Sequence, residues 1–309
     1  MSDFDVVVAG GGIAGLSAGL TAARLGRRTL VLTGGILGGQ LLSIARIDGY
    51  PGFPDGVPGY DLCPMAQEMA AAAGAEIAAE ELLRLAPGND GWRVATGAGS
   101  EHGAKGVILA TGARLKKLGV PGEEALAGKG VSHCATCDGP LLRGRIVAVV
   151  GGGDSAAQEA LTLADYAARV VVLLRGAELS AQAVYRDAVL AQPKIELRAN
   201  TVVEEILGAA SVTGVRLREA GGAAGQLEVA AVFVYVGLAP DSAVLGDLAA
   251  CDAAGAVVVD SAMRTSRSGL GAAGAVRSGW PGRAIASAGD GANAALAIDR
   301  FLRDGTWHE

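Results

Sequence analysis

The sequence predicts an α/β fold made of two Rossmann-like dinucleotide-binding units, and two glycine-rich motifs carry this prediction. The first motif, at residues 10–15, reads Gly-Gly-Gly-Ile-Ala-Gly and stands between an apolar run at 5–9 and an alanine- and leucine-rich segment at 16–25. The second, at 151–156, reads Gly-Gly-Gly-Asp-Ser-Ala and follows an apolar run at 146–150. A G-x-G-x-x-G or G-x-G-x-x-A turn between a strand and a helix is the fingerprint of dinucleotide binding.

Each residue of the first motif has a part in holding a dinucleotide. Gly10 allows a tight turn, Gly12 lets the backbone approach a pyrophosphate, and Gly15 lets the helix pack closely on the strand. The pyrophosphate then lies at the N-terminus of the helix, next to Ile13 and Ala14. We therefore expect these five residues to contact a dinucleotide.

The ribose position of the first unit departs from the fingerprint. An acidic residue is expected after the second strand, where its carboxylate holds a ribose hydroxyl. Thr33 stands at this place, after the apolar run at 29–32. A neutral hydroxyl makes a weaker hydrogen bond than a carboxylate does. We expect Thr33 to contact the ribose with a weaker hold than the fingerprint provides.

The second motif repeats the same unit, with a helix at 157–164 and a strand at 169–174 after it. After that strand, Arg175 is placed to pair with a 2′-phosphate, and Arg186 is a candidate helper from the next segment. Glu178 lies beyond the strand end, so we interpret it as a solvated acid at a helix start rather than as a ribose ligand. The expected nucleotide contacts within the motif are Gly151, Gly153, Asp154, Ser155 and Ala156.

Between the two motifs lies a C-x-x-C sequence formed by Cys134 and Cys137. Two cysteines at this spacing near a βαβ pattern are typical of a redox dithiol, in which one thiolate attacks and the second resolves the mixed disulfide. Asp138 follows directly and is placed to carry the proton that the leaving thiol needs. The alternative, a zinc site, needs two further ligands, and His133 alone does not supply them.

Two loop stretches are also expected to contact the cofactor. A Gly/Pro-rich region begins at residues 38–41, and a long loop in a compact domain is usually functional. A strand beginning at residue 106 ends at 110–112 in small residues, which let the backbone pass close to a ligand. The residues that we expect to contact the cofactor here are Gly39, Gln40, Leu41, Thr111 and Gly112.

Near the C-terminus the sequence predicts a strand at 256–260, a small-residue loop at 265–279 and a final helix. Residues 288–292, which include Asp290 and Gly291, are expected to open that helix, which runs to residue 302. Its N-terminal amides and the positive end of its dipole suit an electron-rich ring edge. We therefore expect Asp290 and Gly291 to lie at the cofactor.

Composition limits the kinds of partner. The net charge of −6 disfavours nucleic acid and anionic membrane as partners. No apolar run reaches the ~18 residues that a membrane span needs. The first five residues are acidic where a signal peptide would be basic. We expect a cytoplasmic protein that binds neither nucleic acid nor membrane.

The order and spacing of these motifs resemble those of the low-molecular-weight thioredoxin reductases, which are class II pyridine nucleotide-disulfide oxidoreductases. The resemblance implies an FAD-binding domain made of residues 1–116 and 246–309. It also implies an NAD(P)H-binding domain, residues 117–245, inserted in the first and carrying the C-x-x-C. The matching stretches are residues 10–15, 38–41, 51–54, 110–112, 134–139, 151–156 and 288–291.

The resemblance also implies roles and partners. Cys137 would face the flavin, Cys134 would attack the disulfide of thioredoxin or a thioredoxin-like protein, and Asp138 would act as acid and base. Hydride would pass from a nicotinamide to FAD, and the electrons then to the dithiol and the partner. A homodimer in which one domain swings between the two half-reactions is implied as well.

Several positions depart from the family pattern. Thr33 replaces an acidic residue, Gly49 replaces an asparagine near the ring, and Ala275 replaces the aspartate that follows Gly274 in the last FAD loop. Each lost charge-assisted bond is worth about 1.5–3 kcal/mol. Gly176 and Ser180 stand where the family has arginines that read the 2′-phosphate. The nucleotide, NADPH or NADH, is therefore left open.

Three hypotheses for the function follow, in order of preference. The first is a flavin-dependent reductase of thioredoxin or a similar protein, fed by NAD(P)H. The second keeps FAD and the dithiol but takes electrons from ferredoxin or passes them to oxygen. The third is a non-catalytic scaffold that has lost its cofactor, and the retained Cys134 and Cys137 argue against it, because an idle scaffold has no use for a reactive dithiol.

Overall fold

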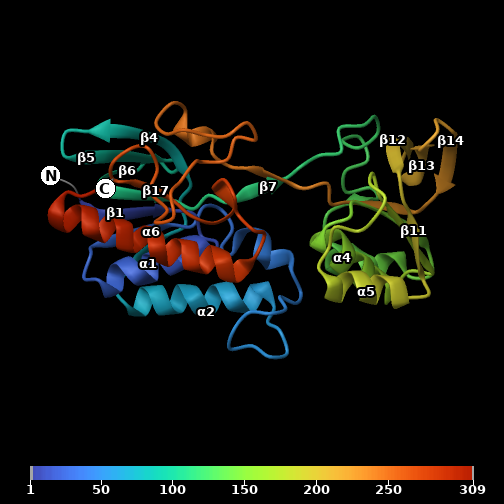
Figure 1. Ribbon diagram of the computed structural model, residues 1–309, viewed down its shortest axis with the longest axis horizontal. Coiled ribbons are helices and arrows are strands. Elements are labelled where there is room, and N and C mark those ends of the chain that lie inside the picture. Colours follow the sequence, from blue (N-terminus) through green and yellow to red (C-terminus); the bar gives the residue numbers. More distant parts are fainter. Residues whose placement is uncertain (1–2, 308–309) are drawn as a thin grey trace. The chain divides into compact units, whose positions relative to one another are not determined.

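The computed structural model describes residues 3–307 and divides the chain into two compact units (Figure 1). The first unit combines the chain up to Arg114 with the chain from Ala239 onward, and the second is Leu115–Leu238. The boundaries expected from the sequence lie two and seven residues later, at 116/117 and 245/246. The division into an FAD-binding and an NAD(P)H-binding domain stays a prediction. Where the chain passes from one unit to the other, β7 (Ala113–Leu115) and β16 (Leu238–Pro240) pair as a two-stranded sheet.

The first unit is built on a seven-stranded sheet of order β3-β2-β1-β6-β5-β4, with β17 also paired to β6. The pairs among β1, β2, β3, β6 and β17 are parallel, and β4 and β5 add an antiparallel edge. The strands are β1 (Phe4–Ala9), β2 (Thr29–Leu32), β3 (Glu76–Ala78), β4 (Leu82–Gly88), β5 (Gly91–Thr96), β6 (Glu101–Leu109) and β17 (Leu270–Ala272).

The two faces of the first strand belong to different cores because side chains alternate along a strand. Val6 and Val8 pack with the helices α1 (Ile13–Arg24), α2 (Gly59–Ala72) and α6 (Ala284–Asp304), which lie together along one side of the sheet (Figure 1). Val7 and Ala9 point to the opposite face. That face is covered by apolar side chains from the antiparallel edge and from the C-terminal segment, namely Leu85, Trp92, Val94, Leu245, Val257 and Val276. Burial on both faces explains why β1 is a continuous apolar run.

The prediction of a strand at 256–260 is wrong. Val257 forms only isolated bridges, to Cys251 and to Arg277. The Val257 amide donates to the Val276 carbonyl and the Val258 amide to the Ala250 carbonyl, so the hydrogen bonds go to two different loops. The apolar run therefore covers the core as an irregular segment, since no neighbouring strand runs alongside it.

The predicted start of the final helix, at residues 288–292, is also wrong. The α6 helix begins at Ala284, so residues 288–292 lie inside it and its N-terminal amides belong to an earlier turn. Gly291, within the segment expected to open the helix, is required for another reason. A Cβ at Gly291 would lie 2.0 Å from the carbonyl oxygen of Ala14, because α6 crosses α1 at this point. Close helix packing, rather than a turn, requires glycine there.

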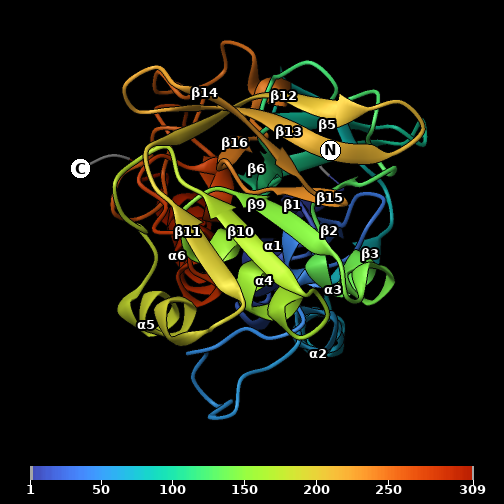
Figure 2. The same cartoon turned by 90° about the vertical axis from the view of Figure 1, so that its right-hand side faces the viewer.

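The second unit has three layers, in which a parallel sheet separates helices from an antiparallel sheet (Figure 2). Val147 and Val149 of β9 pack against the helix α4, and Ala148 and Val150 pack against β12 and β13. The parallel sheet has the order β11-β10-β9-β15-β8, and the antiparallel one β12-β13-β14. The elements are β8 (Val131–Ser132), α3 (Ala135–Asp138), β9 (Ile146–Val150), α4 (Asp154–Ala164), β10 (Arg169–Leu173), α5 (Ala183–Ala191), β11 (Ile195–Arg198), β12 (Thr201–Gly208), β13 (Val212–Glu219), β14 (Ala224–Glu228) and β15 (Ala231–Val234).

The α/β class and the two Rossmann-like units predicted from the glycine motifs are confirmed, since each motif joins a central parallel strand to a helix. Within residues 3–307, no helix is both long enough and apolar enough to span a membrane.

Candidate active site and nucleotide sites

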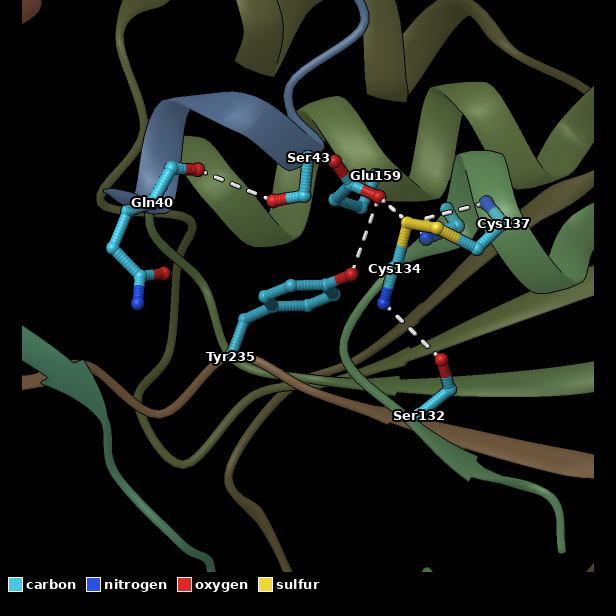
Figure 3. The surroundings of a disulfide bond; sticks show 8 residues. Gln40, Ser43, Ser132, Cys134, Cys137, Glu159 and Tyr235 are labelled. Carbon is cyan, nitrogen blue, oxygen red and sulfur yellow. Dashed lines mark hydrogen bonds between the residues drawn. A yellow bond between two sulfur atoms is a disulfide. The ribbon is translucent and has the colours of Figure 1, made fainter. Parts of the chain in front are cut away.

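Cys134 and Cys137 form a disulfide, with their Cα atoms 5.3 Å apart (Figure 3). Cys134 is the N-cap of the short helix α3, and its sulfur accepts a hydrogen bond from the Cys137 amide at 3.2 Å. The Cys134 amide donates to the Ser132 hydroxyl at 3.1 Å, and the Asp138 amide donates to the Cys134 carbonyl. The predicted cysteines are thus joined in a turn that is held at both ends by local hydrogen bonds.

Two side chains that the sequence analysis did not single out lie against this turn. One carboxylate oxygen of Glu159, Oε2, accepts from the Ala135 amide at 2.8 Å and from the Tyr235 hydroxyl at 3.2 Å (Figure 3). Burial raises the pKa of Glu159, although both hydrogen bonds act to lower it. Burial also raises the pKa of Tyr235, and the charges of Glu159 and Asp138 add to that rise. The Asp138 carboxylate therefore lies close enough to the Tyr235 hydroxyl for its charge to act on that group.

The position of Glu159 in the sequence of α4 does indicate that its side chain is partly buried. It lies on α4, where Ala156, Ala160 and Leu163 are fully buried, and it shares their side of the helix. A carboxylate beside the buried stripe of a helix needs a hydrogen-bond partner. The sequence does not show which partner, because Ala135 is 24 residues away along the chain.

The first glycine motif has the geometry that a pyrophosphate needs. A Cβ at Gly10 would lie 2.0 Å from the Ala110 carbonyl oxygen, and one at Gly15 would lie 1.9 Å from the Gly10 carbonyl oxygen, so both positions require glycine. A Cβ at Gly12 would meet no atom within 4 Å, so the space before the helix is open. The α1 helix has no side-chain cap and no acid in its first turn. Its N-terminal amides are therefore available to an anion, and the site fits a dinucleotide pyrophosphate.

Two hydroxyl groups that we expect to contact the cofactor, those of Thr33 and Thr111, donate hydrogen bonds within the protein. The Thr33 hydroxyl is buried and donates to the Ala78 carbonyl at 3.3 Å. The Thr111 hydroxyl donates to the Asp241 carbonyl at 2.6 Å. Each hydroxyl can still accept a hydrogen bond, but its proton is engaged. The Gly39, Gln40 and Leu41 backbone lies in a short 3₁₀ helix (Gly39–Ser43), and Gly112 has a φ of +76°.

An ion pair organises the loop that precedes α6. Asp290 is buried, and its Oδ2 accepts from the Gly274 amide at 3.2 Å and from Arg277 Nε at 2.7 Å. Its Oδ1 accepts from Arg277 Nη2 at 3.0 Å. Gly274 has a φ of +76°, and a Cβ there would lie 2.8 Å from the Ala14 Cβ. The loop is thereby held against the start of α1. Both oxygens of the Asp290 carboxylate accept hydrogen bonds from Arg277.

The second glycine motif has the same form. A Cβ at Gly151 would lie 2.2 Å from the Tyr235 carbonyl oxygen, whereas one at Gly153 would meet no atom within 4 Å. Asp154 opens α4, and its carboxylate accepts from the Gln182 amide at 2.7 Å and from Gln182 Nε2 at 2.9 Å. Ala156 is fully buried, and Ser155 is exposed. The open end of this helix is a second place for a phosphate.

The groups expected to read a 2′-phosphate are few. Arg175 is exposed, and no ion pair of its side chain occurs among residues 3–307. Arg186 lies 3.7 Å from Asp187, which reduces its use as a helper. The Ser180 hydroxyl donates to the Gly152 carbonyl at 3.1 Å.

Comparison with known proteins identifies the class of protein. Residues 4–291 match the family model described as pyridine nucleotide-disulphide oxidoreductase. The thioredoxin reductase of Treponema pallidum is 39% identical over 302 residues, covering 97% of this chain and 98% of that protein. The thioredoxin reductase of Listeria monocytogenes is 36% identical over 303 residues, covering 97% of this chain and 94% of that one.

Solved structures agree with this result. The thioredoxin reductase of Lactococcus lactis, described as the FR conformation, has a TM-score of 0.94 at 34% identity and covers 97% of this chain and 99% of its own. That of T. acidophilum has a TM-score of 0.92 at 35% identity, with 98% and 99% covered. This chain therefore belongs to the pyridine nucleotide-disulphide oxidoreductases, and within them to the low-molecular-weight thioredoxin reductases. It is a flavin-dependent thiol–disulfide oxidoreductase that uses FAD, and the predicted family, enzyme class and cofactor are confirmed.

Proposed function

We propose that this enzyme reduces the disulfide of thioredoxin or a thioredoxin-like protein in the cytoplasm, as a homodimer, with electrons from a nicotinamide nucleotide. The observation that carries the proposal is the Cys134–Cys137 disulfide in the unit that also bears the second glycine motif. The relatives named thioredoxin reductase match over nearly their whole length, which supports the same partner.

We assign the steps of disulfide exchange to named residues. In the reduced enzyme the Cys134 thiolate attacks one sulfur of the partner disulfide and forms a mixed disulfide, and the partner's other sulfur leaves as a thiolate. The Cys137 thiolate then attacks Cys134, which restores the Cys134–Cys137 disulfide and releases the second partner sulfur. Asp138 lies next to Cys137 and supplies a proton to a leaving sulfur. The partner gains two electrons and two protons, and the enzyme dithiol loses them.

The first unit supplies the groups that would hold FAD. The N-terminal amides of α1 after Gly12 would bind the pyrophosphate, and Gly274 and Gly291 keep the C-terminal segment close to Ala14 at the same helix end. Bound FAD supplies a two-electron relay between nicotinamide and dithiol. Thr33 and Ala275 provide no carboxylate, so the protein holds this cofactor mainly through backbone groups and the helix end.

The test is anaerobic reduction of thioredoxin by the FAD-bound enzyme with either nicotinamide nucleotide, followed by trapping of free thiols. We expect two new thiols on thioredoxin for each nucleotide oxidised. Oxidised thioredoxin that persists while the enzyme dithiol is reduced would contradict the choice of partner.

A second function is favoured by one observation, the single exposed Arg175 at the expected 2′-phosphate position. With only one cation there, the enzyme would bypass nicotinamide and take electrons from reduced ferredoxin, or pass dithiol electrons to oxygen. In that case neither nucleotide reduces the enzyme. Reduction of the enzyme by reduced ferredoxin would indicate that ferredoxin is the electron donor, and consumption of oxygen by the reduced dithiol would indicate that oxygen is the acceptor.

Introducing arginines tests the nucleotide site directly. The double variant Gly176→Arg with Ser180→Arg places two guanidinium groups on the exposed stretch beside Arg175. A charge-assisted hydrogen bond is worth about 1.5–3 kcal/mol. We therefore expect kcat/KM for NADPH to rise by about 10- to 100-fold, with kcat/KM for NADH little changed. The neutral pair Gly176→Gln with Ser180→Gln is the matched control. Unchanged NADPH kinetics would show that this stretch does not meet the 2′-phosphate.

A further inference from the structure

Glu159 is attached to the turn between the two cysteines through a single peptide nitrogen. Its Oε2 accepts from the amide of Ala135, the residue that follows Cys134, at 2.8 Å. The same oxygen accepts from the Tyr235 hydroxyl at 3.2 Å. Ala135 is fully buried and Tyr235 nearly so, and Figure 3 shows the side chains of Glu159 and Tyr235 beside the disulfide. The carboxylate thus lies within one peptide unit of the Cys134 residue.

Burial raises the pKa of Glu159, and its two hydrogen bonds act against that rise. Both partners donate to it, and donors stabilise the ionised form of a carboxyl group. Among residues 3–307, Glu159 has no ion pair with lysine, arginine or histidine. The other titratable groups near the turn are Asp138 on α3, whose charge acts on Tyr235, and His133, whose Nδ1 lies 2.9 Å from the Val234 carbonyl oxygen. The ionised Glu159 carboxylate is therefore fixed in place by two donors, and no cation pairs with it among the described residues.

A fixed negative charge acts unequally on the two redox states of a dithiol. The disulfide carries no charge, whereas the reduced pair is stabilised by ionising one thiol. A carboxylate nearby makes that thiolate less favourable, since like charges repel. Oxidoreductases whose reduced form is stabilised are oxidants. The opposite arrangement favours the disulfide and makes the dithiol a better reductant.

We propose that Glu159 is a positioning residue that keeps the Cys134–Cys137 dithiol reducing, by fixing the Ala135 amide and by holding a negative charge against the turn. Tyr235 holds the carboxylate in that position. The couple on which the charge acts is the disulfide plus two electrons and one proton, giving one thiol and one thiolate. The inference extends the proposed function by adding a residue that sets its driving force.

Glu159→Gln tests the charge separately from the geometry. Its amide oxygen can still accept from the Ala135 amide, while the negative charge is lost. The variant is equilibrated in a thiol–disulfide buffer, and the thiols of Cys134 and Cys137 are trapped and quantified. We expect the equilibrium constant for reduction to rise about tenfold, which is about 30 mV for a two-electron couple. The pKa of the more acidic thiol, followed by thiolate absorbance, should fall.

Glu228→Gln is the matched control, because Glu228 is exposed on β14 of the same unit and loses the same charge. It should leave the equilibrium constant and the thiol pKa unchanged. A Glu159→Gln enzyme with the wild-type equilibrium constant and thiol pKa would overturn the inference and leave the proposed function intact. Absence of any reversible Cys134–Cys137 couple in the wild type would instead overturn the proposed function.

Tyr235→Phe provides a second test that does not remove the carboxyl group. Loss of the hydroxyl donor raises the pKa of Glu159 further, so the carboxyl group becomes protonated at a higher pH. We expect the variant and the wild type to share one equilibrium constant at about pH 8. As the pH falls to about 6, the variant should become the more oxidising of the two. Coinciding curves over that whole range would contradict a role for the Glu159 charge.

Discussion

Replacing Cys134 by serine is expected to abolish reduction of the protein disulfide while leaving reduction of the bound flavin by nucleotide intact. Cys134 is the N-cap of α3, and its sulfur is joined to Cys137. A serine hydroxyl can take the same hydrogen bond from the Cys137 amide, so the turn should persist. Without the sulfur, no disulfide forms to receive electrons and no thiolate attacks the partner. Removal of an enzyme nucleophile costs at least about 10³-fold in rate.

Two further variants complete this test. Cys137→Ser should equally stop electron transfer from flavin to the dithiol, but it retains the Cys134 thiol, which should accumulate as a mixed disulfide with the partner. Cys251→Ser removes an exposed free cysteine and should retain full turnover. If Cys134→Ser kept wild-type disulfide turnover, the assignment of the dithiol would be wrong.

The largest loss of stability is expected from Asp290→Ala. The substitution leaves the Arg277 guanidinium, with only 14% of its side chain exposed, and the Gly274 amide without their common acceptor. Removing one partner of a buried ion pair costs about 3–5 kcal/mol. The denaturant midpoint of the FAD-bound enzyme should fall accordingly, and flavin should be released earlier in the titration, because Gly274 lies against the start of α1.

The double variant Asp290→Ala with Arg277→Met should recover part of this loss, since no charge is then left unpaired. Glu76→Ala, which breaks an exposed pair with Arg28, is the control and should cost less than about 1 kcal/mol. If Asp290→Ala lost no more stability than Glu76→Ala, the ion pair would not organise the loop.

The parts of the fold that sequence predicts well are those fixed by local geometry. Gly10, Gly15 and Gly151 are required by backbone atoms that would collide with a side chain, and such requirements leave a spacing that can be read directly. The cysteine pair is equally local, because three residues of separation suffice to close a disulfide. These features give both Rossmann-like units and the redox site.

The errors and omissions come from contacts between distant segments. Residues 288–292 are predicted to open the final helix, although they lie inside it and Gly291 allows α1 and α6 to cross closely. The run at 256–260 has strand composition, yet no strand lies beside it. The role of Glu159 depends on its hydrogen bond from Ala135, and the role of Arg277 depends on its ion pair with Asp290. No rule of sequence spacing predicts either contact.

The central claim is that a nicotinamide nucleotide reduces the dithiol through the bound flavin. The most direct measurement is an anaerobic titration of the FAD-bound enzyme with NADPH and then NADH, following the flavin absorption band and trapping the thiols of Cys134 and Cys137. The predicted result is a bleached band together with two new thiols per enzyme once two equivalents of nucleotide have been added, one for the flavin and one for the dithiol. A band that neither nucleotide bleaches, but a chemical reductant does, would contradict the claim and show that nicotinamide is not the electron source.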